Sequence, residues 1–360
     1  MKEYFNFILS TFYDLGRLIH IERSHRGYIN ETFKLNLLKN NKKDHYVLRR
    51  YRTGTPKKRI AFEHALMLEL IKQGFNISPL IIPTKDHATF VKIPSKMENR
   101  IEDRYISIFT MLPGKDKYSW NNPLCTDAEL RDAAKVLASY HGAIYEWKGI
   151  DAWTDQRNID RIVLMSKRWQ YYAQHAGESS FDQYFLEQFE YLCLELNKIQ
   201  FKKIYNEMPH LAIHGDYHPG NLKFENEKVI GVFDFDWSKI DIRCFDVALA
   251  LLYFCSSWDG IDEGHILLDR TESFLEAYQK VAGEIDTIGP LDTMELEHLP
   301  EMIHLSNLFL IDWILEGYYS SDSDSQEYKT YLRHSVQMMR WMDSHRDQLY
   351  TRVLKFENVQ

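Results

Sequence analysis

The spacing of apolar residues changes along the chain and predicts a first part built on β-strands and a second part built on helices. In several short runs apolar residues alternate with polar ones, as in half-buried strands. Elsewhere they recur every three or four residues, as in amphipathic helices. We predict strands over residues 19–23, 32–37, 44–52, 88–93 and 105–111, and helices over 1–16, 57–71, 126–141, 247–254, 299–317 and 328–356. Residues 158–205 are predicted to form a largely helical segment.

The length of the chain favours two lobes over a single domain. It has 360 residues, of which 44% are hydrophobic and 14% aromatic, enough for substantial cores. The formal net charge of −8 argues against a general nucleic-acid-binding protein, which needs a basic surface. We therefore expect small-molecule partners and no nucleic acid, and the oligomeric state stays open.

The cysteines and the apolar runs predict a cytoplasmic protein without a membrane span. The four cysteines are scattered and form no CxxC pair, which favours reduced thiols. The most apolar run, residues 247–255, is too short to cross a bilayer. Polar residues interrupt the N-terminal segment, which also lacks a cleavage site for a signal peptidase.

The candidate chemistry lies between residues 211 and 246. A polar turn at 214–221 contains Asp216 and, five positions later, Asn221; a hairpin through 225–227 then leads to Asp234 at the end of an apolar run. In kinases an Asp accepts the proton of the attacking hydroxyl, and an Asn and a second Asp hold the metal ions. Amide and carboxylate oxygens suit Mg²⁺. This order and spacing predict phosphoryl transfer.

The residues HGDYHPGN at 214–221 and FDFDW at 233–237 resemble the aminoglycoside phosphotransferase and choline kinase superfamily, whose loop reads HGD, four further residues and Asn. That superfamily includes type II homoserine kinase-like and spore-coat kinase-like proteins. The resemblance implies a bilobal α+β fold of the protein-kinase type. An N-lobe of antiparallel sheet and helix would span residues 1–112, and a helical C-lobe over 113–360 would hold the catalytic loop and the acceptor pocket.

The resemblance also implies an ATP- and Mg²⁺-dependent O-phosphotransferase that acts on the hydroxyl of a small molecule. Acceptors of this family include homoserine, choline, ethanolamine, aminosugars and aminoglycosides, and the sequence does not choose among them. Asp216 would be the catalytic base, and Asn221 and Asp234 the metal ligands. Arg49 stands where the family usually has the lysine that grips phosphates, and Glu63 would orient it.

Further roles are implied for other positions. The nucleotide would also meet a phosphate-covering turn and a connector after the last strand, at Gly27, Asn30, Thr110, Met111 and Leu112. Supporting contacts around the catalytic residues are expected from His214, Asp236 and Asp246, with Asp246 bracing the loop. Strand alternation points Arg50 away from Arg49.

Acceptor contacts are predicted at His218, Asp312 and Glu316. Asp312 and Glu316 lie one helical turn apart and could bind an ammonium group, whereas a solvated helix face is the favoured explanation of the pair. We expect His141 to be a packed core residue and Asp241 to lie in a loop.

Two other functions remain open at this point. His214, Asp216, His218 and Asp234 could ligate the metal of a phosphoesterase, but no further histidine cluster completes a two-metal site. A kinase-like protein that binds nucleotide without turnover is the second alternative, and it rests on the replacement of the usual lysine by Arg49.

Overall fold

The computed structural model describes residues 2–24, 29–97, 100–149, 157–199, 204–320 and 325–356. The chain divides into two compact units. The first, here the N-terminal unit, consists mainly of Met1–Gly114 and Gly231–Asp236. The second, the C-terminal unit, contains Lys115–Lys148, Thr154–Ile230 and Trp237–Gln360. Asp234 therefore belongs to the N-terminal unit, although the residues that directly precede Gly231 belong to the C-terminal unit.

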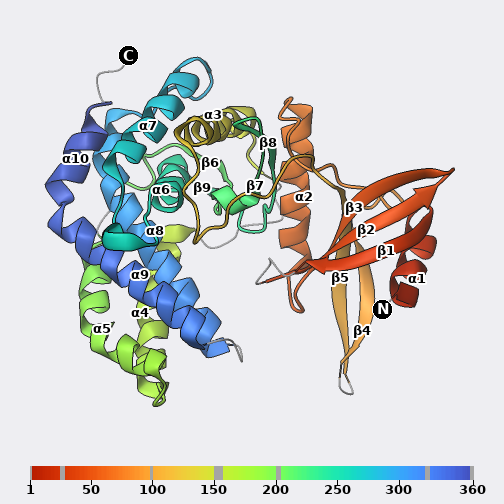
Figure 1. The fold of residues 1–360 in the computed structure, drawn as a ribbon, viewed down its shortest axis with the longest axis horizontal. Coiled ribbons are helices and arrows are strands. Elements are labelled where there is room, and N and C mark those ends of the chain that lie inside the picture. Colours follow the sequence, from red (N-terminus) through yellow and green to blue (C-terminus); the bar gives the residue numbers. More distant parts are fainter. Residues whose placement is uncertain are drawn as a thin grey trace. The chain divides into compact units, whose positions relative to one another are not determined.

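The N-terminal unit is built on one five-stranded antiparallel sheet in the order β1-β2-β3-β5-β4 (Figure 1). Its elements are α1 (Lys2–Phe12), β1 (Arg17–Ser24), β2 (Glu31–Lys39), β3 (Lys42–Arg50), α2 (Lys57–Lys72), β4 (Val91–Met97) and β5 (Arg100–Thr110). β4 continues to Met97 and β5 begins at Arg100, beyond the ends of the strands predicted over 88–93 and 105–111. Their ladder runs from Val91 opposite Ile106 to Met97 opposite Arg100, so backbone pairing carries polar residues into the strands.

Alternation along β2 and β3 decides which side chains face each side of the sheet. Leu35 and Leu37 of β2 and Leu48 of β3 are fully buried in one core, which also contains apolar residues of α1. The neighbouring residue in β3, Arg49, must project to the other face. A two-residue turn with positive φ at Asn40 (50°) and Asn41 (63°) joins the strands, and asparagine tolerates this conformation. The turn therefore sets the register that aims Arg49.

The C-terminal unit consists mainly of helices around two short strand pairs, β6 with β9 and β7 with β8. The strands are β6 (His210–Ile213), β7 (Leu222–Glu225), β8 (Lys228–Val232) and β9 (Lys239–Ile242). The helices are α3 (Asp127–Ile144), α4 (Asn158–His175), α5 (Ser180–Lys198), α6 (Arg243–Phe254), α7 (Leu268–Gly283), α8 (Thr293–Ser320), α9 (Ser325–Ser344) and α10 (Arg346–Leu354). Local chemistry explains the start of α3, where Thr126 and Glu129 form a capping box.

Two sequence predictions about the C-terminal unit are wrong. The last helix is not continuous, because His345 leaves helical geometry (φ −118°, ψ 21°) and separates α9 from α10. Both pieces pack against α8, and α10 also packs against α7, so tertiary contacts redirect the chain. Asp241 lies in strand β9 rather than in a loop, fully buried, with Oδ2 accepting the Asn158 N–H at 2.8 Å. Burial of a charged residue needs such partners.

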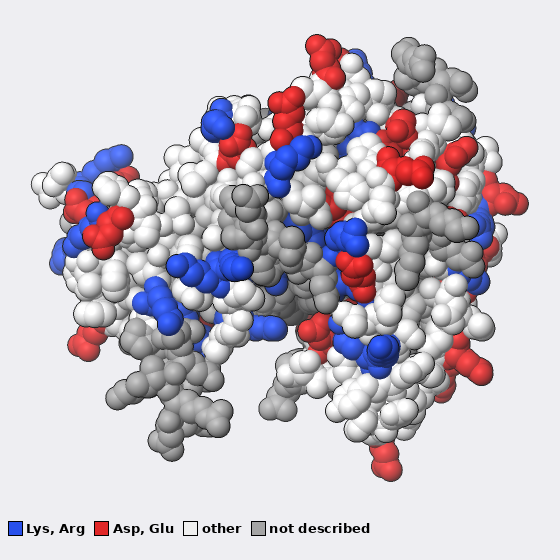
Figure 2. Space-filling model, turned by 180° about the vertical axis from the view of Figure 1, so that it is seen from behind, with Lys and Arg blue, Asp and Glu red and all other residues white. Residues whose placement is uncertain are grey.

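Acidic and basic side chains are interspersed on the face shown in Figure 2. Among the residues that the structure describes, no helix combines the length and the apolar character that a membrane span requires.

Candidate functional site

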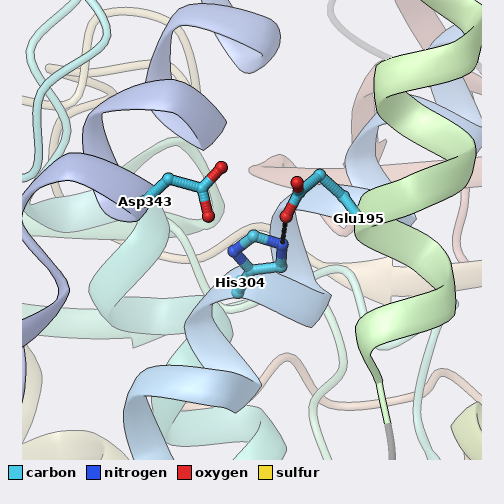
Figure 3. A group of neighbouring side chains, drawn as sticks. All are labelled: Glu195, His304 and Asp343. Carbon is cyan, nitrogen blue, oxygen red and sulfur yellow. Dashed lines mark ion pairs between the residues drawn. The ribbon is translucent and has the colours of Figure 1, made fainter.

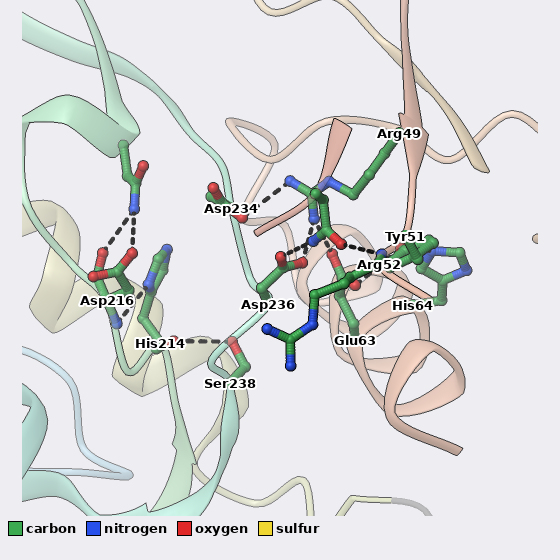
Figure 4. Close-up of polar contacts among 12 residues, drawn as sticks. Arg49, Tyr51, Arg52, Glu63, His64, His214, Asp216, Asp234, Asp236 and Ser238 are labelled. Atoms are coloured by element: carbon green, nitrogen blue, oxygen red, sulfur yellow. Dashed lines mark hydrogen bonds and ion pairs between the residues drawn. The ribbon is translucent and has the colours of Figure 1, made fainter. Parts of the chain in front are cut away.

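The loop between β6 and β7 holds Asp216 and Asn221 in direct contact. Nδ2 of Asn221 donates to the backbone oxygen of Asp216 at 2.9 Å and to its Oδ2 at 3.0 Å. The Asp216 N–H donates to Nδ1 of His214 at 3.3 Å, a contact drawn in Figure 4. The residue between them, Gly215, has φ +73°, and a Cβ there would lie 2.5 Å from the backbone oxygen of Trp237. Only glycine therefore fits the turn that presents Asp216.

Two aromatic side chains lie beside Asp216. Nε2 of His218 is 3.6 Å from Oδ2 of Asp216, and Nδ1 of His218 accepts the Gly220 N–H at 3.0 Å. The ring of Tyr253, from α6, lies 5.1 Å from the His218 ring. Burial, together with the charge of Asp216 and a hydrogen bond to it, raises the pKa of Tyr253 well above its ordinary value. The Tyr253 hydroxyl therefore stays protonated and can donate to the carboxylate.

Asp246 anchors the start of this loop from the first turn of α6. Its carboxylate accepts the N–H groups of His214 at 2.8 Å and Gly215 at 2.9 Å, and Nε2 of His141 lies 3.1 Å from Oδ2. Burial alone would raise the pKa of Asp246, but the hydrogen bond from His141, with that from the Gly215 N–H, brings it below its ordinary value. Asp246 is thus a buried anion with three donors.

His141 is a core residue, as predicted, and it also orients Asp246. Its side chain is fully buried, and burial lowers its pKa despite the neighbouring carboxylate. A neutral imidazole with Nε2 toward Asp246 carries its proton there, so Nδ1 accepts the hydroxyl of Tyr278 at 2.7 Å. The Ser238 hydroxyl also holds the loop, because it donates to the backbone oxygen of His214 at 3.2 Å.

In the N-terminal unit, Arg49 is surrounded by three carboxylates. Nη1 lies 2.8 Å from Oε1 of Glu63 and 2.5 Å from Oδ1 of Asp236, and Nη2 lies 3.0 Å from Oδ1 of Asp234 (Figure 4). We call these four residues the Arg49 cluster. Only Asp234 is partly open, with 36% of its side chain exposed, against 12% for Arg49 and Asp236. Arg49 thus holds the acids with its planar fork, as guanidinium groups do.

The Arg49 cluster carries more negative than positive charge. Burial raises the pKa of both Glu63 and Asp236, and the charge of Asp234 adds to each rise although Arg49 opposes it. Asp234 also has φ +67°, a left-handed conformation that non-glycine residues seldom adopt. Strain of this kind gathers at functional sites. The arrangement therefore suits an additional cation at the exposed acid.

Two further residues hold the main chain and carboxylate of Asp236. The side-chain amide of Asn30 donates to the carboxylate, and its Oδ1 accepts the Arg52 N–H at 2.9 Å. Nη2 of Arg59 donates to the backbone oxygen of Asp236 at 2.6 Å. Sequence reasoning missed Arg59, although it precedes Glu63 by four positions on α2 and so shares its face.

Arg50 lies on the opposite face of β3, as the alternation predicts. Its Nε donates to Oε2 of Glu31 at 2.6 Å, and Arg104 pairs with the same oxygen at 2.8 Å. Neither Arg50 nor Glu31 belongs to the Arg49 cluster.

The expected nucleotide neighbours after β5 are tied to the backbone of adjacent segments. Oγ1 of Thr110 accepts the Leu80 N–H at 2.9 Å, and the Met111 N–H points to the His45 oxygen at 3.4 Å. Leu112 follows directly. Gly27 lies outside the described residues. The roles of these positions in nucleotide binding stay predictions.

Asp312 and Glu316 occupy different environments on α8. Asp312 is fully buried, accepts Nε1 of Trp169 at 3.0 Å and Nε of Arg168 at 3.3 Å, and lies 3.6 Å from Arg161. A solvated face is therefore wrong for Asp312, because α4 covers it. Glu316 is exposed. Their role as acceptor contacts stays a prediction.

An aromatic group that sequence reasoning did not single out lies next to the loop between β6 and β7. A Cβ on Gly220 would approach the Cα of Ser119 to 3.1 Å, which places the following residue, Trp120, beside the loop. The Trp120 ring contacts three others at centroid distances of 4.4–5.9 Å, namely Tyr331, Trp258 and Trp313. Trp120, Trp258 and Trp313 lie far apart in the sequence, and no spacing pattern predicts that their side chains meet.

The phosphoesterase alternative gains no support from these positions. Within the part of the chain that the structure describes, one group of at least three metal-ligand side chains is found, and it contains none of His214, Asp216 and His218. The loop histidines instead use Nδ1 to accept backbone N–H groups.

The model of a family described as "Phosphotransferase enzyme family" matches residues 20–289. The sequence is 25% identical to a homoserine kinase of Agrobacterium fabrum over 313 residues, 84% of each chain. It is 30% identical to a homoserine kinase of Polaromonas naphthalenivorans over 106 residues, which are 29% of this chain and 30% of the relative.

Solved structures are similar to this one over most of their length. A microcompartment-associated aminopropanol kinase superposes with a TM-score of 0.66 at 15% identity, covering 98% of this chain and 99% of the other. An amicoumacin kinase in complex with AMP-PNP, Ca²⁺ and amicoumacin gives 0.61 at 14% identity, covering 89% and 88%. The predicted α+β fold of the protein-kinase type and the resemblance to its small-molecule kinases are confirmed.

Proposed function

Because the chain belongs to the phosphotransferase enzyme family, we propose that it transfers the γ-phosphoryl group of ATP to the hydroxyl of a small alcohol, with Mg²⁺ as the metal. In this reaction the acceptor oxygen forms a bond to the γ-phosphorus, the bond to the bridging oxygen breaks, and ADP leaves. The observation that carries the proposal is the pairing of Asp216 with Asn221 in one loop, together with the acid excess around Arg49.

Asp216 is the residue that accepts the proton of the attacking hydroxyl. Its carboxylate is 22% exposed, so a substrate can reach it, and Asn221 holds one of its oxygens. The anchoring of the preceding backbone N–H groups by Asp246 keeps this carboxylate in one orientation. Such positioning is the main contribution of a protein to phosphoryl transfer.

Asn221 and Asp234 each offer an oxygen that suits a hard divalent cation, and we assign both to the metal. Asn221 uses its amide nitrogen within the loop, which leaves Oδ1 without a hydrogen bond among the described residues. Oδ1 of Asp234 accepts a hydrogen bond from Arg49, and its Oδ2 accepts none from the described residues. One amide and one carboxylate oxygen are a usual protein share of a Mg²⁺ shell. When bound, the ion would neutralise charge that develops on the phosphate oxygens.

Arg49 grips phosphate oxygens of the nucleotide, and Glu63 steadies it. The guanidinium is held between β3 and α2 at the distances given above, and it remains charged because the surrounding acids raise its pKa despite burial. Arginine can meet two phosphate oxygens with its fork, which lysine cannot. We assign the turn at Gly27 and Asn30 and the connector at Thr110, Met111 and Leu112 to the same nucleotide.

For the acceptor, the aromatic group around Trp120 favours an alcohol that carries an ammonium. Trp120, Trp258 and Trp313 are partly exposed, and cations bind well over indole faces. Homoserine, choline, ethanolamine and aminosugars share that group. His218 lies 3.6 Å from Asp216, where it could contact the reacting end of the acceptor.

ATP as the donor and four free cysteines fit action in the cytoplasm.

The test is a screen for ADP release over amino alcohols, aminosugars and aminoglycosides, with ³¹P NMR of the product. Asp216→Asn serves as the blank and the exposed Asp86→Asn as a matched control. We expect a phosphorylated product with the wild type and the control and none with Asp216→Asn. Product formation that persists in Asp216→Asn would show that another group accepts the proton.

The same screen separates the alternatives. Release of phosphate from a generic ester without nucleotide would favour a phosphoesterase. A thermal shift with ATP and Mg²⁺, without ADP from any acceptor, would favour a catalytically silent nucleotide-binding protein.

A further inference from the structure

Three side chains that the proposed kinase reaction does not use meet where α5, α8 and α9 pack together. They are Glu195 of α5, His304 of α8 and Asp343 of α9 (Figure 3). Each offers one ligand atom, and these atoms all lie within 4.8 Å of one another. All three residues belong to the C-terminal unit, and none belongs to the catalytic loop.

Only one oxygen of the buried Glu195 carboxylate accepts a hydrogen bond. Glu195 is 2% exposed, and its Oε2 has no hydrogen-bond partner among the described residues. Nε2 of His304 lies 3.2 Å from this oxygen, at ion-pair distance, and it too has no hydrogen-bond partner among them. A buried carboxylate oxygen and a ring nitrogen at this distance can offer their lone pairs to one cation.

The other oxygen of each carboxylate is held by a donor. Nζ of Lys198 lies 2.6 Å from Oε1 of Glu195, and the Tyr191 hydroxyl donates to Oδ2 of Asp343 at 2.9 Å. Such outer contacts orient the ligands in metal sites. Lys198 and Tyr191 therefore hold the two carboxylates in position.

We propose that Glu195, His304 and Asp343 bind a divalent first-row transition metal, with Zn²⁺ as the ion that fits them best. One imidazole nitrogen and two carboxylate oxygens are accepted zinc ligands, and water would take the fourth position. The mixed N and O donors favour such a metal over Mg²⁺ or Ca²⁺, which prefer oxygen alone. Ligand atoms around tetrahedral zinc are about 3.4 Å apart, so small side-chain rotations close the site.

The ammonium group of Lys198 competes with a metal ion for these carboxylates, so the test must distinguish the two. Nζ of Lys198 lies 3.5 Å from Oδ1 of Asp343 and 2.6 Å from Oε1 of Glu195, so its ammonium pairs with both carboxylates without metal. Lys198 is 55% exposed and can leave Asp343 for water. A bound ion would tie α5 to α8 and α9, so it should also raise thermal stability.

The experiment measures Zn²⁺ retained by the full chain after chelator treatment, reloading and gel filtration in excess Mg²⁺, which occupies hard-cation sites. We expect one equivalent per chain and a higher Tm with Zn²⁺ than without it. Asp343→Asn, at a partly exposed residue that should not disturb folding, and His304→Gln should each weaken Zn²⁺ binding at least tenfold.

Matched controls are His298→Gln, on the same helix with its Nδ1 on the Met294 oxygen, and the exposed Asp347→Asn. Both should bind like the wild type. Equal Zn²⁺ affinity in the wild type, His304→Gln and Asp343→Asn, or no retained Zn²⁺ in the wild type, would overturn the proposal and leave an ion-pair cluster. The outcome does not depend on the proposed kinase activity.

Discussion

Nη1 of Arg49 lies 2.8 Å from Oε1 of Glu63, and the two side chains are 12% and 5% exposed. The same guanidinium reaches Asp234 and Asp236, so one cation pairs with three acids at once. Removal of the cation from a buried cluster leaves charge without compensation.

Arg49→Ala should therefore lower the free energy of unfolding by about 3 kcal/mol and abolish saturable ATP binding. Urea denaturation and nucleotide titration would measure the two effects. The matched control is Arg50→Ala on the same strand, whose partner is Glu31. Arg50→Ala should lower the free energy of unfolding by about 1 kcal/mol and leave ATP binding unchanged. An equal loss of ATP binding in both variants would contradict the assignment of Arg49.

Asp234→Asn and Asp236→Asn should separate catalysis from stability. Asp234 is the more exposed acid and is assigned to the metal, so Asp234→Asn should reduce kcat about a thousandfold with little change in unfolding. Asp236 is nearly buried and accepts Arg49 and Asn30, so Asp236→Asn should lower stability by about 2 kcal/mol.

Both properties should be measured on the same preparations, by product formation and by denaturation. A greater loss of kcat in Asp236→Asn at equal fraction folded would move the metal to Asp236.

Gly215→Ala should damage the catalytic loop more than an ordinary glycine substitution. The added Cβ would lie 2.5 Å from the Trp237 oxygen at a φ of +73°, and we expect a loss of about 3 kcal/mol in stability. The neighbouring Asp216 would shift, so kcat should fall even where the protein is folded. The control is Gly54→Ala, also at positive φ but with no atom near the added Cβ; a similar loss there would show that backbone strain alone is responsible.

His334 should make the protein less stable in acid. Its ring is fully buried and stacked 3.6 Å from Trp258, and burial lowers its pKa from 6.5 to about 3. Between these values the unfolded chain binds a proton that the folded chain does not, so stability falls as the pH decreases from 6.5 toward 3. The slope is about 1.4 kcal/mol per pH unit.

His334→Phe should remove that part of the acid sensitivity, about 2 kcal/mol between about pH 7 and about pH 5. Denaturation at the two pH values, compared with His20→Phe at an exposed position, measures the difference. An unchanged slope in His334→Phe would mean that this imidazole takes up its proton in the folded state.

Local patterns in the sequence determined the elements and the kind of chemistry. The Thr126–Glu129 capping box, the alternation that separates Arg49 from Arg50, and the loop from His214 to Asn221 depend on neighbours a few residues away. The sequence by itself also led to the phosphotransferase family, because several polar residues at fixed spacing between apolar runs seldom occur by chance.

Tertiary structure alone decided the contacts between distant segments. The place of Asp236 beside Arg49, the burial of Asp312 under α4, the strand position of Asp241, the break at His345 and the meeting of Glu195, His304 and Asp343 are contacts of this kind. Burial and charge pairing depend on packing that brings together distant residues, such as Arg49 and Asp236, which are 187 positions apart. No local sequence pattern indicates which carboxylates become buried away from solvent.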